Sequence, residues 1–364
     1  MIRILHCVNN MHRAGLETML MNYYRNIDRS EIQFDFLMHR QEPSDYDDEI
    51  LAMGGRIYRA PRLYPQNYPA YFTYMKRFFR EHPEYRIIHS HIDSMSYLPL
   101  LAAKRAGVPI RIAHSHNTAI DKDFKYLLKQ LFRFGITSVA NVYAACGEEA
   151  GKFLFAGKRF RVIPNAIDAE QFLFDGETRL QKREELGLRD KFVVGHVGRM
   201  SYQKNHTFLL DIFGQVAGKC EDAVLVLVGV GEKEAEIRQK VQTMNLTDRV
   251  IFLGKRSDVK ELYQAMDVFL LPSLFEGVPV VGIEAQFSGL SCIFSDKVPK
   301  EVQISENCSF IELTQPADVW AEEVLKRNGT DRSNVSISSD YDIRHAHDAL
   351  AQYYRELYIG LNEK

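Results

Sequence analysis

The chain has 364 residues, 46% of them hydrophobic, and a formal net charge of −2. This length is too great for one ordinary hydrophobic core and predicts two domains of average size. A balanced charge excludes the broad basic surface that nucleic-acid-binding proteins use, so we expect no nucleic acid as a partner.

The five cysteines are scattered and form no C-x-x-C pair, which argues against a disulfide framework or a zinc ribbon. A reducing compartment, the cytoplasm, fits this pattern. The N-terminal apolar run is too short and too polar-flanked for a signal peptide. No run approaches the roughly 18–20 apolar residues of a membrane span, so we expect any membrane contact to be peripheral.

Short apolar runs alternate with helical patterns along the first half of the chain. Such runs predict buried parallel strands, because helices cover both faces of a sheet of this kind. The predicted strands are residues 2–8, 32–38, 86–89, 110–113, 142–145 and 161–163. The predicted helices are residues 17–26, 71–81, 95–106, 122–134 and 148–155.

The same alternation restarts after Asn165 and predicts a second domain of the same kind. The predicted strands are residues 192–197, 223–228, 250–252, 268–271 and 291–294. The predicted helices are residues 205–216, 232–244, 258–264, 279–288 and 342–358, with a Ser/Asn/Asp-rich loop at 329–340. The pattern is typical of doubly wound α/β sheets.

We therefore predict two α/β domains, residues 1–165 and 166–341, joined near residues 164–190. That joint carries the charged run at residues 182–185. The last helix, at about residues 342–364, is expected to pack back on the first domain. Ligands of open α/β sheets bind at the carboxyl ends of the strands, so the chemistry should lie in the loops that follow strands.

The strongest motif, FEGVPVVGIE at residues 275–284, follows the fourth predicted strand of the second half. Gly277 and Pro279 suit a tight loop that opens a helix, with Pro279 near the first helical position. Free backbone N–H groups and the helix dipole favour an anion such as a diphosphate there. Glu276 can point at the ligand, and Glu284 can reach sugar hydroxyls. The alternative is an ordinary helix start with Glu276 as its polar residue.

The second motif, GHVGRMSYQKN at residues 195–205, follows the first strand of the second half and opens a helix. Gly198 allows a sharp turn. Arg199 offers a planar fork for phosphate oxygens and Lys204 a point charge. Such cations neutralise the charge that grows on a diphosphate leaving group. The alternative is a pair of solvated surface cations.

With these two motifs in this order and at this spacing, the chain resembles the family 4 retaining glycosyltransferases of the GT-B fold. Their hallmarks are an Arg and a Lys after the first strand of the second domain, then Glu-x7-Glu, here Glu276 and Glu284. Supporting matches are VIPNAID at 162–168, VGVG at 228–231 and FLGKRSDV at 252–259. In detail the chain is similar to bacterial members that build capsular or exopolysaccharide repeat units.

The resemblance implies two Rossmann-like domains that face each other across a cleft. It also implies a hexosyltransferase that moves a sugar from a UDP-sugar to a glycan or lipid-linked sugar, with retention and without a divalent metal. The implied catalytic residues are Glu276, Lys204, Arg199 and His114. The implied donor-binding residues are Gly15, Arg199, Lys204, Arg256, Glu276, Gly277, Val278 and Glu284. The implied acceptor-binding residues are His114, His116 and His91.

Within the donor set, the resemblance gives Glu276 the hydroxyls of the donor sugar and Glu284 the ribose. Arg256 lies where the family holds the base, largely through the backbone. The family's Gly-Gly-x-Glu loop after the first strand begins here with Ala14 and Gly15. Ala tolerates a positive φ poorly, so we expect this loop to differ from that of the family.

Four histidines form two H-x-H pairs, His89/His91 and His114/His116, and each pair follows a predicted strand. A metal site is one interpretation, although the H-E-x-x-H arrangement is missing. Binding and orienting the acceptor is another, and plain structural hydrogen bonding is a third. Two further functions stay open beside the transferase: a catalytically silent sugar-nucleotide-binding protein and a metal-dependent hydrolase.

Two helices of the first half combine basic and aromatic residues, at 71–80 and 122–134. Basic amphipathic helices bind anionic membrane surfaces, and a lipid-linked acceptor favours such contact at the inner face of the cell membrane. The alternative is that both helices pack on a sheet and leave a solvated basic face. The sequence does not decide between the two.

Overall fold

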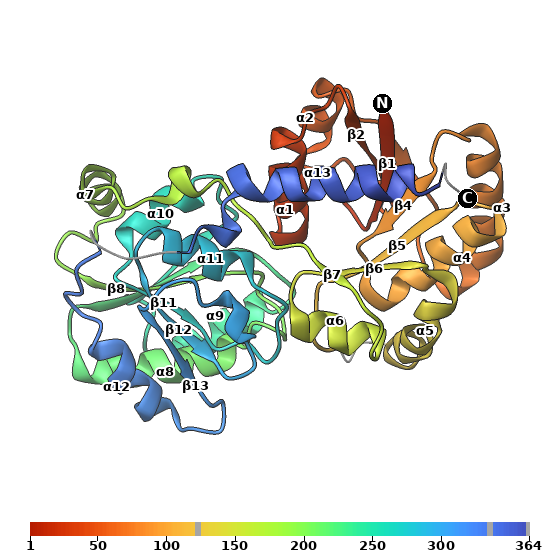
Figure 1. Ribbon diagram of the computed structural model, residues 1–364. Helices are drawn as coiled ribbons and strands as arrows, with labels where there is room; N and C mark the ends of the chain where they lie inside the picture. The colour runs from red at the N-terminus through yellow and green to blue at the C-terminus, as the bar shows by residue number, and fades with distance from the viewer. Residues whose placement is uncertain (121–124, 333–337, 362–364) are drawn as a thin grey trace. The chain divides into compact units, whose positions relative to one another are not determined.

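The computed structural model describes residues 1–120, 125–332 and 338–361 and divides into two compact units. The first comprises Met1–Ala166 and Asp340–Lys364, and the second comprises Ile167–Ser339. Each unit is a parallel sheet with helices packed against it (Figure 1). The predicted α/β class with two doubly wound sheets is confirmed.

The sheet of the first unit has the strand order β3-β2-β1-β4-β5-β6-β7, and all of its paired strands are parallel. The order reverses between β1 and β4, which creates a crevice at their carboxyl ends. The strands are β1 (Ile2–Val8), β2 (Ile32–Met38), β3 (Ile57–Arg59), β4 (Ile87–Ser90), β5 (Ile110–Ser115), β6 (Val142–Ala145) and β7 (Arg161–Val162). The helices are α1 (Gly15–Asn26), α2 (Asp47–Ala52), α3 (Tyr68–Glu81), α4 (Tyr97–Arg105), α5 (Tyr126–Val139), α6 (Glu148–Phe155) and α13 (Ile343–Ile359), with 3-10 turns η1 (Pro65–Asn67) and η2 (Asp93–Ser96).

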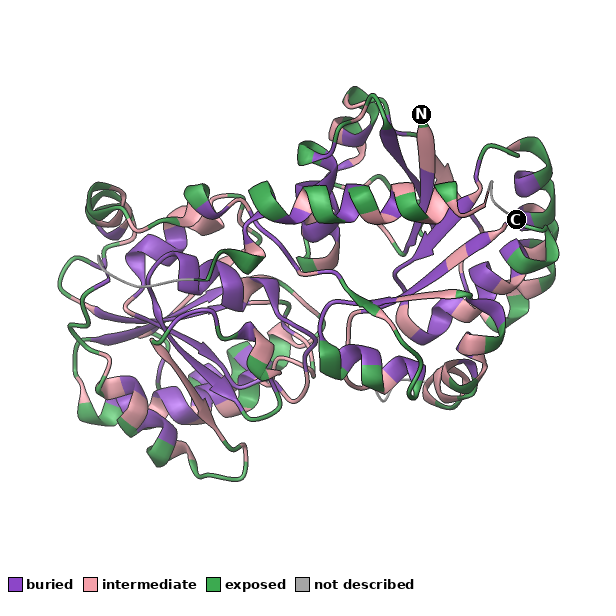
Figure 2. Cartoon of the chain, in the orientation of Figure 1, coloured by how far each residue is buried: buried purple, intermediate pink, exposed green. Residues whose placement is uncertain are grey.

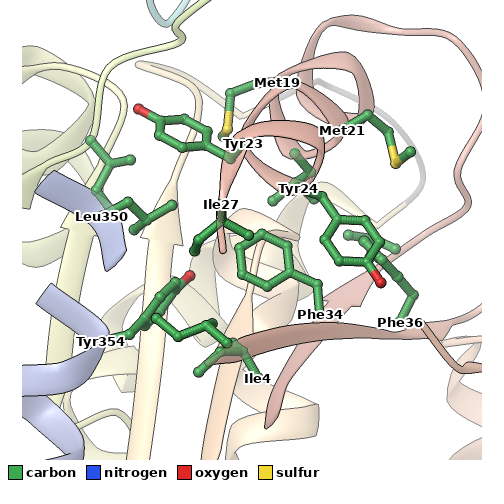
Figure 3. Packing of buried hydrophobic residues seen from close by; sticks show 14 of the residues in the cluster. Ile4, Met19, Met21, Tyr23, Tyr24, Ile27, Phe34, Phe36, Leu350 and Tyr354 are labelled. Carbon is green, nitrogen blue, oxygen red and sulfur yellow. The ribbon is translucent and has the colours of Figure 1, made fainter. Parts of the chain in front are cut away.

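The last helix, α13, belongs to the core of the first unit. Its apolar residues, among them Leu350 and Tyr354, pack in one buried cluster with Ile4 of β1 and Tyr23 of α1. Figure 3 shows Tyr354 beside Ile4 and Leu350 beside Tyr23. The periodic burial of α13 explains its position, since its apolar stripe needs a partner surface. Residues 362–364 of the predicted final helix lie outside the described residues.

The sheet of the second unit has the order β10-β9-β8-β11-β12-β13, again with parallel pairs and with its reversal between β8 and β11. Its strands are β8 (Phe192–Val197), β9 (Ala223–Val228), β10 (Val250–Gly254), β11 (Val268–Leu271), β12 (Ser291–Ser295) and β13 (Cys308–Ile311). Its helices are α7 (Gly176–Glu185), α8 (His206–Lys219), α9 (Glu234–Thr243), α10 (Val259–Ala265), α11 (Val280–Phe287) and α12 (Ala317–Leu325), with η3 (Ala169–Phe172) and η4 (Lys300–Val302). The 3-10 turn η5 (Ser339–Tyr341) begins with the last residue of this unit and continues into the first.

The charged run at residues 182–185 is not part of a linker, and this corrects the predicted joint. It ends α7, which packs in the second unit beside α10. Asp175 caps this helix by accepting from the backbone N–H groups of its first turn. Arg183 is buried and forms an ion pair with Asp267 at 3.2 Å. The charged run is therefore part of a helix, and its cations form ion pairs within the second unit.

The sequence missed three helices and the strands at one edge of each sheet. They are α2, α7, α12, β3 and β13. The central strands read correctly because both of their faces are buried, as Figure 2 shows in purple. Residues 122–124 of one predicted helix and 333–337 of the predicted loop lie outside the described residues. Within the described part of the chain, no helix has both the length and the apolar character needed to cross a membrane.

Candidate functional site

In the second unit, the loops after β8 and β11 meet at the point where the strand order reverses. Lys204 Nζ lies 2.6 Å from Glu276 Oε1, and their side chains are only 13% and 7% exposed. Gln203 Nε2 donates to the other carboxylate oxygen of Glu276 at 3.1 Å and to the Phe275 carbonyl at 3.0 Å. Both oxygens of this carboxylate are thus held, and its charge is matched by a buried ammonium.

Asn205 explains why Lys204 faces Glu276. Its backbone is left-handed, with φ 55°, immediately before α8 begins. Asn is one of the few residues that adopt this conformation readily. Its side-chain Nδ2 donates to the Pro272 carbonyl at 3.1 Å, which ties the turn to the loop after β11. The sequence did not single out Gln203 or Asn205, because neither carries a periodic or charge signal.

Two glycines let the neighbouring loop support this site from behind. An added Cβ at Gly229 would lie 2.1 Å from the Gly198 carbonyl oxygen, and one at Gly231 would lie 2.3 Å from the Met200 carbonyl oxygen. The Gly198 N–H donates to the Val228 carbonyl at 2.9 Å. The VGVG match after β9 therefore has a packing role: only residues without a Cβ allow the loop after β8 to lie so close.

Arg199 lies apart from the buried pair in its contacts. Its side chain is 73% exposed and forms an ion pair with Glu232 at 3.0 Å. The sequence predicted two cations acting together after β8. In the structure Lys204 contacts Glu276, whereas Arg199 lies on the surface and pairs with Glu232, which the motifs do not contain.

Glu284 is buried on α11 and accepts a hydrogen bond from the Tyr263 hydroxyl at 2.9 Å. Burial raises the pKa of Glu284 to about 7, while the Tyr263 hydrogen bond acts in the opposite direction. Tyr263 lies on α10 and was not predicted as a site residue. Gly277 and Val278 are buried in the loop before α11, and Pro279 is the N-cap residue, one position earlier than expected.

The Arg256 guanidinium is engaged within its own loop. It forms two hydrogen bonds with Asp258, at 2.7 and 2.6 Å, and Lys182 lies 2.9 Å from the same carboxylate. These cations hold the pKa of Asp258 well below its usual value. The Arg256 side chain is therefore bound to Asp258, and the expected base site at this loop stays a prediction.

The loop after β1 does not place Ala14 at a positive φ. Ala14 has φ −140° and ψ 172°, an extended conformation that Ala adopts freely, and α1 begins at Gly15. Ala14 is therefore unstrained, and the expected difference between this loop and that of the family stays a prediction. Glu17, in the first turn, is buried, and burial raises its pKa to about 7.

The first unit collects five histidines on one face of its sheet. Side chains alternate between the faces of a strand, so the face that carries Ile4, Ile87 and Ile110 near the start of the strands carries histidines toward the carboxyl ends. His6 of β1 is the direct neighbour of His89 of β4. The five are His6, His89, His91, His114 and His116, and four of them are buried.

The five rings form two hydrogen-bonded rows. In the first row, His6 Nδ1 lies 3.0 Å from His91 Nε2, and His91 Nδ1 lies 3.0 Å from His116 Nε2. In the second row, His89 Nε2 lies 3.0 Å from His114 Nδ1. The rows stack, with ring centroids 4.2 Å apart for His89 and His91 and 4.0 Å for His114 and His116.

Burial keeps these imidazoles neutral at ordinary pH. It lowers the pKa of His6 and His116 to about 3, and it lowers the pKa of His89, His91 and His114 well below the usual value, helped by the neighbouring rings. Neutral imidazole is the form that binds metals. Two groups have ligand atoms within 4.8 Å of one another: His6 with His89 and His91, and His91 with His114 and His116.

Asp93 fixes the outer end of the first row. It follows β4 with φ 46°, an uncommon conformation for a non-glycine residue. Its carboxylate accepts from the His116 backbone N–H at 2.7 Å and from Asn117 Nδ2 at 2.8 Å. Local strain of this kind gathers at functional sites. The sequence analysis missed Asp93, since an aspartate in a loop gives no distinct signal.

The two basic amphipathic helices differ in what they bury. On α3, Tyr71, Phe78 and Phe79 are buried, so its aromatic face belongs to the core. On α5, the side chains of Leu127, Leu131 and Phe134 are 81%, 65% and 77% exposed at helical spacing. The solvated-face alternative therefore describes α3, whereas α5 presents an apolar stripe.

Comparisons with known proteins identify the family of this chain. A family model described as Glycosyltransferase Family 4 matches residues 13–171, and one described as Glycosyl transferases group 1 matches residues 191–326. The putative glycosyltransferase EpsF of Bacillus subtilis (strain 168) is 38% identical over 334 residues, 89% of this chain and 87% of that protein.

A second relative and a solved structure agree. The UDP-Gal:alpha-D-GlcNAc-diphosphoundecaprenol alpha-1,3-galactosyltransferase of Escherichia coli is 34% identical over 225 residues, 58% of either chain. The structure of Anabaena Alr3699/HepE in complex with UDP-glucose has a TM-score of 0.82 at 19% identity and covers 98% of this chain and 100% of its own. That likeness shows the fold, which is GT-B. The chain belongs to family 4 of the glycosyltransferases, and it is a glycosyltransferase.

Proposed function

We propose that this enzyme transfers a hexose from a UDP-sugar, with retention, to a glycan or lipid-linked sugar during synthesis of a cell-surface polysaccharide. The observation that carries the proposal is the buried Lys204–Glu276 pair at the reversal point of the second sheet. Ligands of doubly wound sheets bind there. The names of the relatives support a sugar nucleotide as donor and a lipid-linked sugar as acceptor.

On the donor side, Lys204 and Glu276 have different roles. Lys204 neutralises negative charge that moves onto the diphosphate, and Glu276 accepts from hydroxyls of the donor sugar. Arg199 is exposed and held by Glu232 at the surface, so it can exchange this partner for a phosphate oxygen. With two cations and the N–H groups near Gly277 and Val278, no divalent metal is needed.

The remaining donor-binding residues are Glu284 and Arg256, which we assign to the nucleoside, and Gly15 in the loop after β1. Glu284 faces the Tyr263 hydroxyl, so it already occupies a polar contact of the kind that a ribose hydroxyl offers. The loop of Arg256 supplies backbone groups to the base, because its guanidinium is bound to Asp258. Gly15 opens α1, whose first N–H groups favour an anion.

On the acceptor side, His114 and His116 bind sugar hydroxyls, and His91 supports them, because both of its ring nitrogens contact His6 and His116. His91, His114 and His116 lie at the carboxyl ends of β4 and β5, beside the reversal point of that sheet. Neutral imidazoles give one donor and one acceptor each, which suits hydroxyls. His114 lies nearest to the reacting sugar in this proposal.

A lipid-linked acceptor gives the apolar stripe of α5 a role. Leu127, Leu131 and Phe134 are exposed together, and a stripe of this kind inserts into the headgroup region of a bilayer. Two basic side chains contribute less, because Lys125, the N-cap residue of α5, donates to the Leu63 carbonyl and Arg133 donates to the Phe153 carbonyl. We place the enzyme in the cytoplasm, at the inner face of the cell membrane.

A donor screen tests the proposal. Purified enzyme is incubated with a panel of UDP- and GDP-sugars in the presence of a chelator, and nucleotide release and transfer to lipid-linked sugar are measured. We expect turnover with one or a few UDP-sugars. Binding of a sugar nucleotide without any transfer to any acceptor would instead identify a catalytically silent binding protein.

A further inference from the structure

Tyr354 reaches from the last helix to the histidine face of the first sheet. Its hydroxyl lies 2.7 Å from His89 Nδ1, although the two residues are 265 positions apart in the chain. His89 Nε2 in turn lies 3.0 Å from His114 Nδ1. All three side chains are buried, and His114 Nε2 at the outer end of this row has no hydrogen-bond partner among the residues that the structure describes.

The protons of this row can be counted. A neutral imidazole carries one N–H and one lone pair, and a tyrosine hydroxyl has a single proton to donate. If Tyr354 donates to His89 Nδ1, then His89 carries its proton on Nε2 and donates to His114 Nδ1. His114 must then carry its own proton on Nε2.

The opposite order leaves more buried groups unsatisfied. In that order His114 Nδ1 donates to His89, and His89 Nδ1 donates to the Tyr354 oxygen. The hydroxyl proton of Tyr354 then has no acceptor among the described residues, and His114 Nε2 is still unpaired. Buried polar groups without partners are strongly disfavoured, so the first order is preferred by one unsatisfied group.

We propose that Tyr354 is a positioning residue that fixes the tautomer of His114, so that His114 presents an Nε2–H donor to a sugar oxygen. His114 therefore does not act as a general base through this nitrogen. The sugar oxygen in this statement rests on the proposed function, whereas the tautomer rests only on the hydrogen-bonded row. Burial also lowers the pKa of His114, which is consistent with a group that donates and does not take up a proton.

The neighbouring row, His6, His91 and His116, has no residue with the role of Tyr354 among the described residues. His6 is its inner end, and His6 Nε2 is buried without a partner in the described part of the chain. No hydroxyl supplies a proton there among the contacts of the described residues, so neither order is favoured by an inner donor. The contrast assigns the fixed tautomer to His114 and not to His116.

Nitrogen-15 NMR of the histidine side chains tests the tautomer without substrate. In the wild-type enzyme we expect one form of His114, with the proton on Nε2. In Tyr354→Phe the two orders leave equal numbers of unsatisfied groups, so we expect a mixture of the Nε2–H and Nδ1–H forms. Tyr353→Phe, one position earlier on α13, is the matched control and keeps the wild-type form.

A wild-type His114 with its proton on Nδ1 overturns the proposal. That form is also the one expected if His91, His114 and His116 bound a metal through the free nitrogen of His114. A folded Tyr354→Phe variant with unchanged His114 signals overturns it as well. Because the wild-type spectrum alone decides the tautomer, a variant that does not fold leaves the test intact.

Transfer assays connect the tautomer to the reaction. If half of the Tyr354→Phe molecules carry the wrong tautomer, kcat/KM falls about twofold, since activity scales with the competent fraction. Tyr353→Phe keeps the wild-type kcat/KM. A fixed Nε2–H form in an enzyme that transfers no sugar would contradict the proposed function but not the role of Tyr354, so the two failures are distinguishable.

Discussion

Lys204 and Glu276 form an ion pair at 2.6 Å, although 72 positions separate them. Their loops follow β8 and β11, the two strands between which the sheet order reverses. The pair therefore lies at the edge of the sheet where the ligands of doubly wound folds bind.

Removal of either partner should abolish most of the transfer. We expect Lys204→Ala and Glu276→Ala each to lower kcat on the order of 10²–10³-fold, the usual loss when a group that stabilises transition-state charge is removed. Lys191→Ala is the control, because this lysine pairs with Asp222 at the amino end of the same sheet. Wild-type rates in a Lys204→Ala/Glu276→Ala enzyme would show that the donor site lies elsewhere.

The same pair should also stabilise the second unit. Lys204→Met leaves the nearly buried Glu276 carboxylate without its cation, and we expect a loss on the order of 3 kcal/mol in the free energy of unfolding. Lys204→Met combined with Glu276→Leu should recover most of that loss, since no charge stays buried. Lys191→Met, in an exposed pair, should cost no more than about 1 kcal/mol. Urea unfolding measures all three, and additive losses in the double variant would contradict this account.

The sequence predicted the two motifs of the second unit because they lie where strands end. Strands buried on both faces give continuous apolar runs, as in β8 and β9, and the residues after them are therefore easy to locate. The sequence could not predict that Glu232 would hold Arg199. Both side chains are exposed, and surface ion pairs follow from local geometry that no periodic pattern records.

The sequence could not predict contacts between distant parts of the chain, for a different reason. The bond between Tyr354 and His89 depends on how α13 packs across the first sheet, and the pattern of α13 reveals only that one of its faces is apolar. The sequence also could not give the φ of Ala14, because a motif names a residue type and not its backbone conformation. The roles of the site residues in binding and catalysis stay predictions.

Glu284 should make stability depend on pH. Burial raises its pKa from the ordinary value of 4.5 to about 7, so between these values the folded protein holds a proton that the unfolded chain has lost. This contribution is fully present below pH 4.5 and disappears as pH rises through 7, a change of about 3 kcal/mol. Glu284→Gln keeps an acceptor for Tyr263 but cannot ionise, so the stability difference between wild type and this variant should change by about 3 kcal/mol across this pH range.

Urea unfolding at about pH 5 and about pH 8 measures this effect. Glu17, and the buried histidines whose lowered pKa values act in the opposite direction, are the same in both proteins, so the change in the difference between wild type and Glu284→Gln isolates Glu284. Glu236→Gln, on the exposed surface of α9, is a matched control that should leave the slope unchanged. Equal slopes in wild type and Glu284→Gln would mean that Glu284 is ionised in the folded protein.

The apolar stripe of α5 should bind membranes. We expect the wild-type enzyme to float with vesicles that contain anionic lipid, and to do so at high salt as well, because Lys125 and Arg133 are bound to backbone carbonyls. Replacement of Leu127, Leu131 and Phe134 by serine should abolish flotation while sugar transfer to a soluble acceptor continues. Leu180→Ser removes a single exposed leucine of α7 and should change nothing. If the wild-type enzyme stays with the soluble fraction at every salt concentration, the stripe has another partner and the proposed membrane contact is wrong.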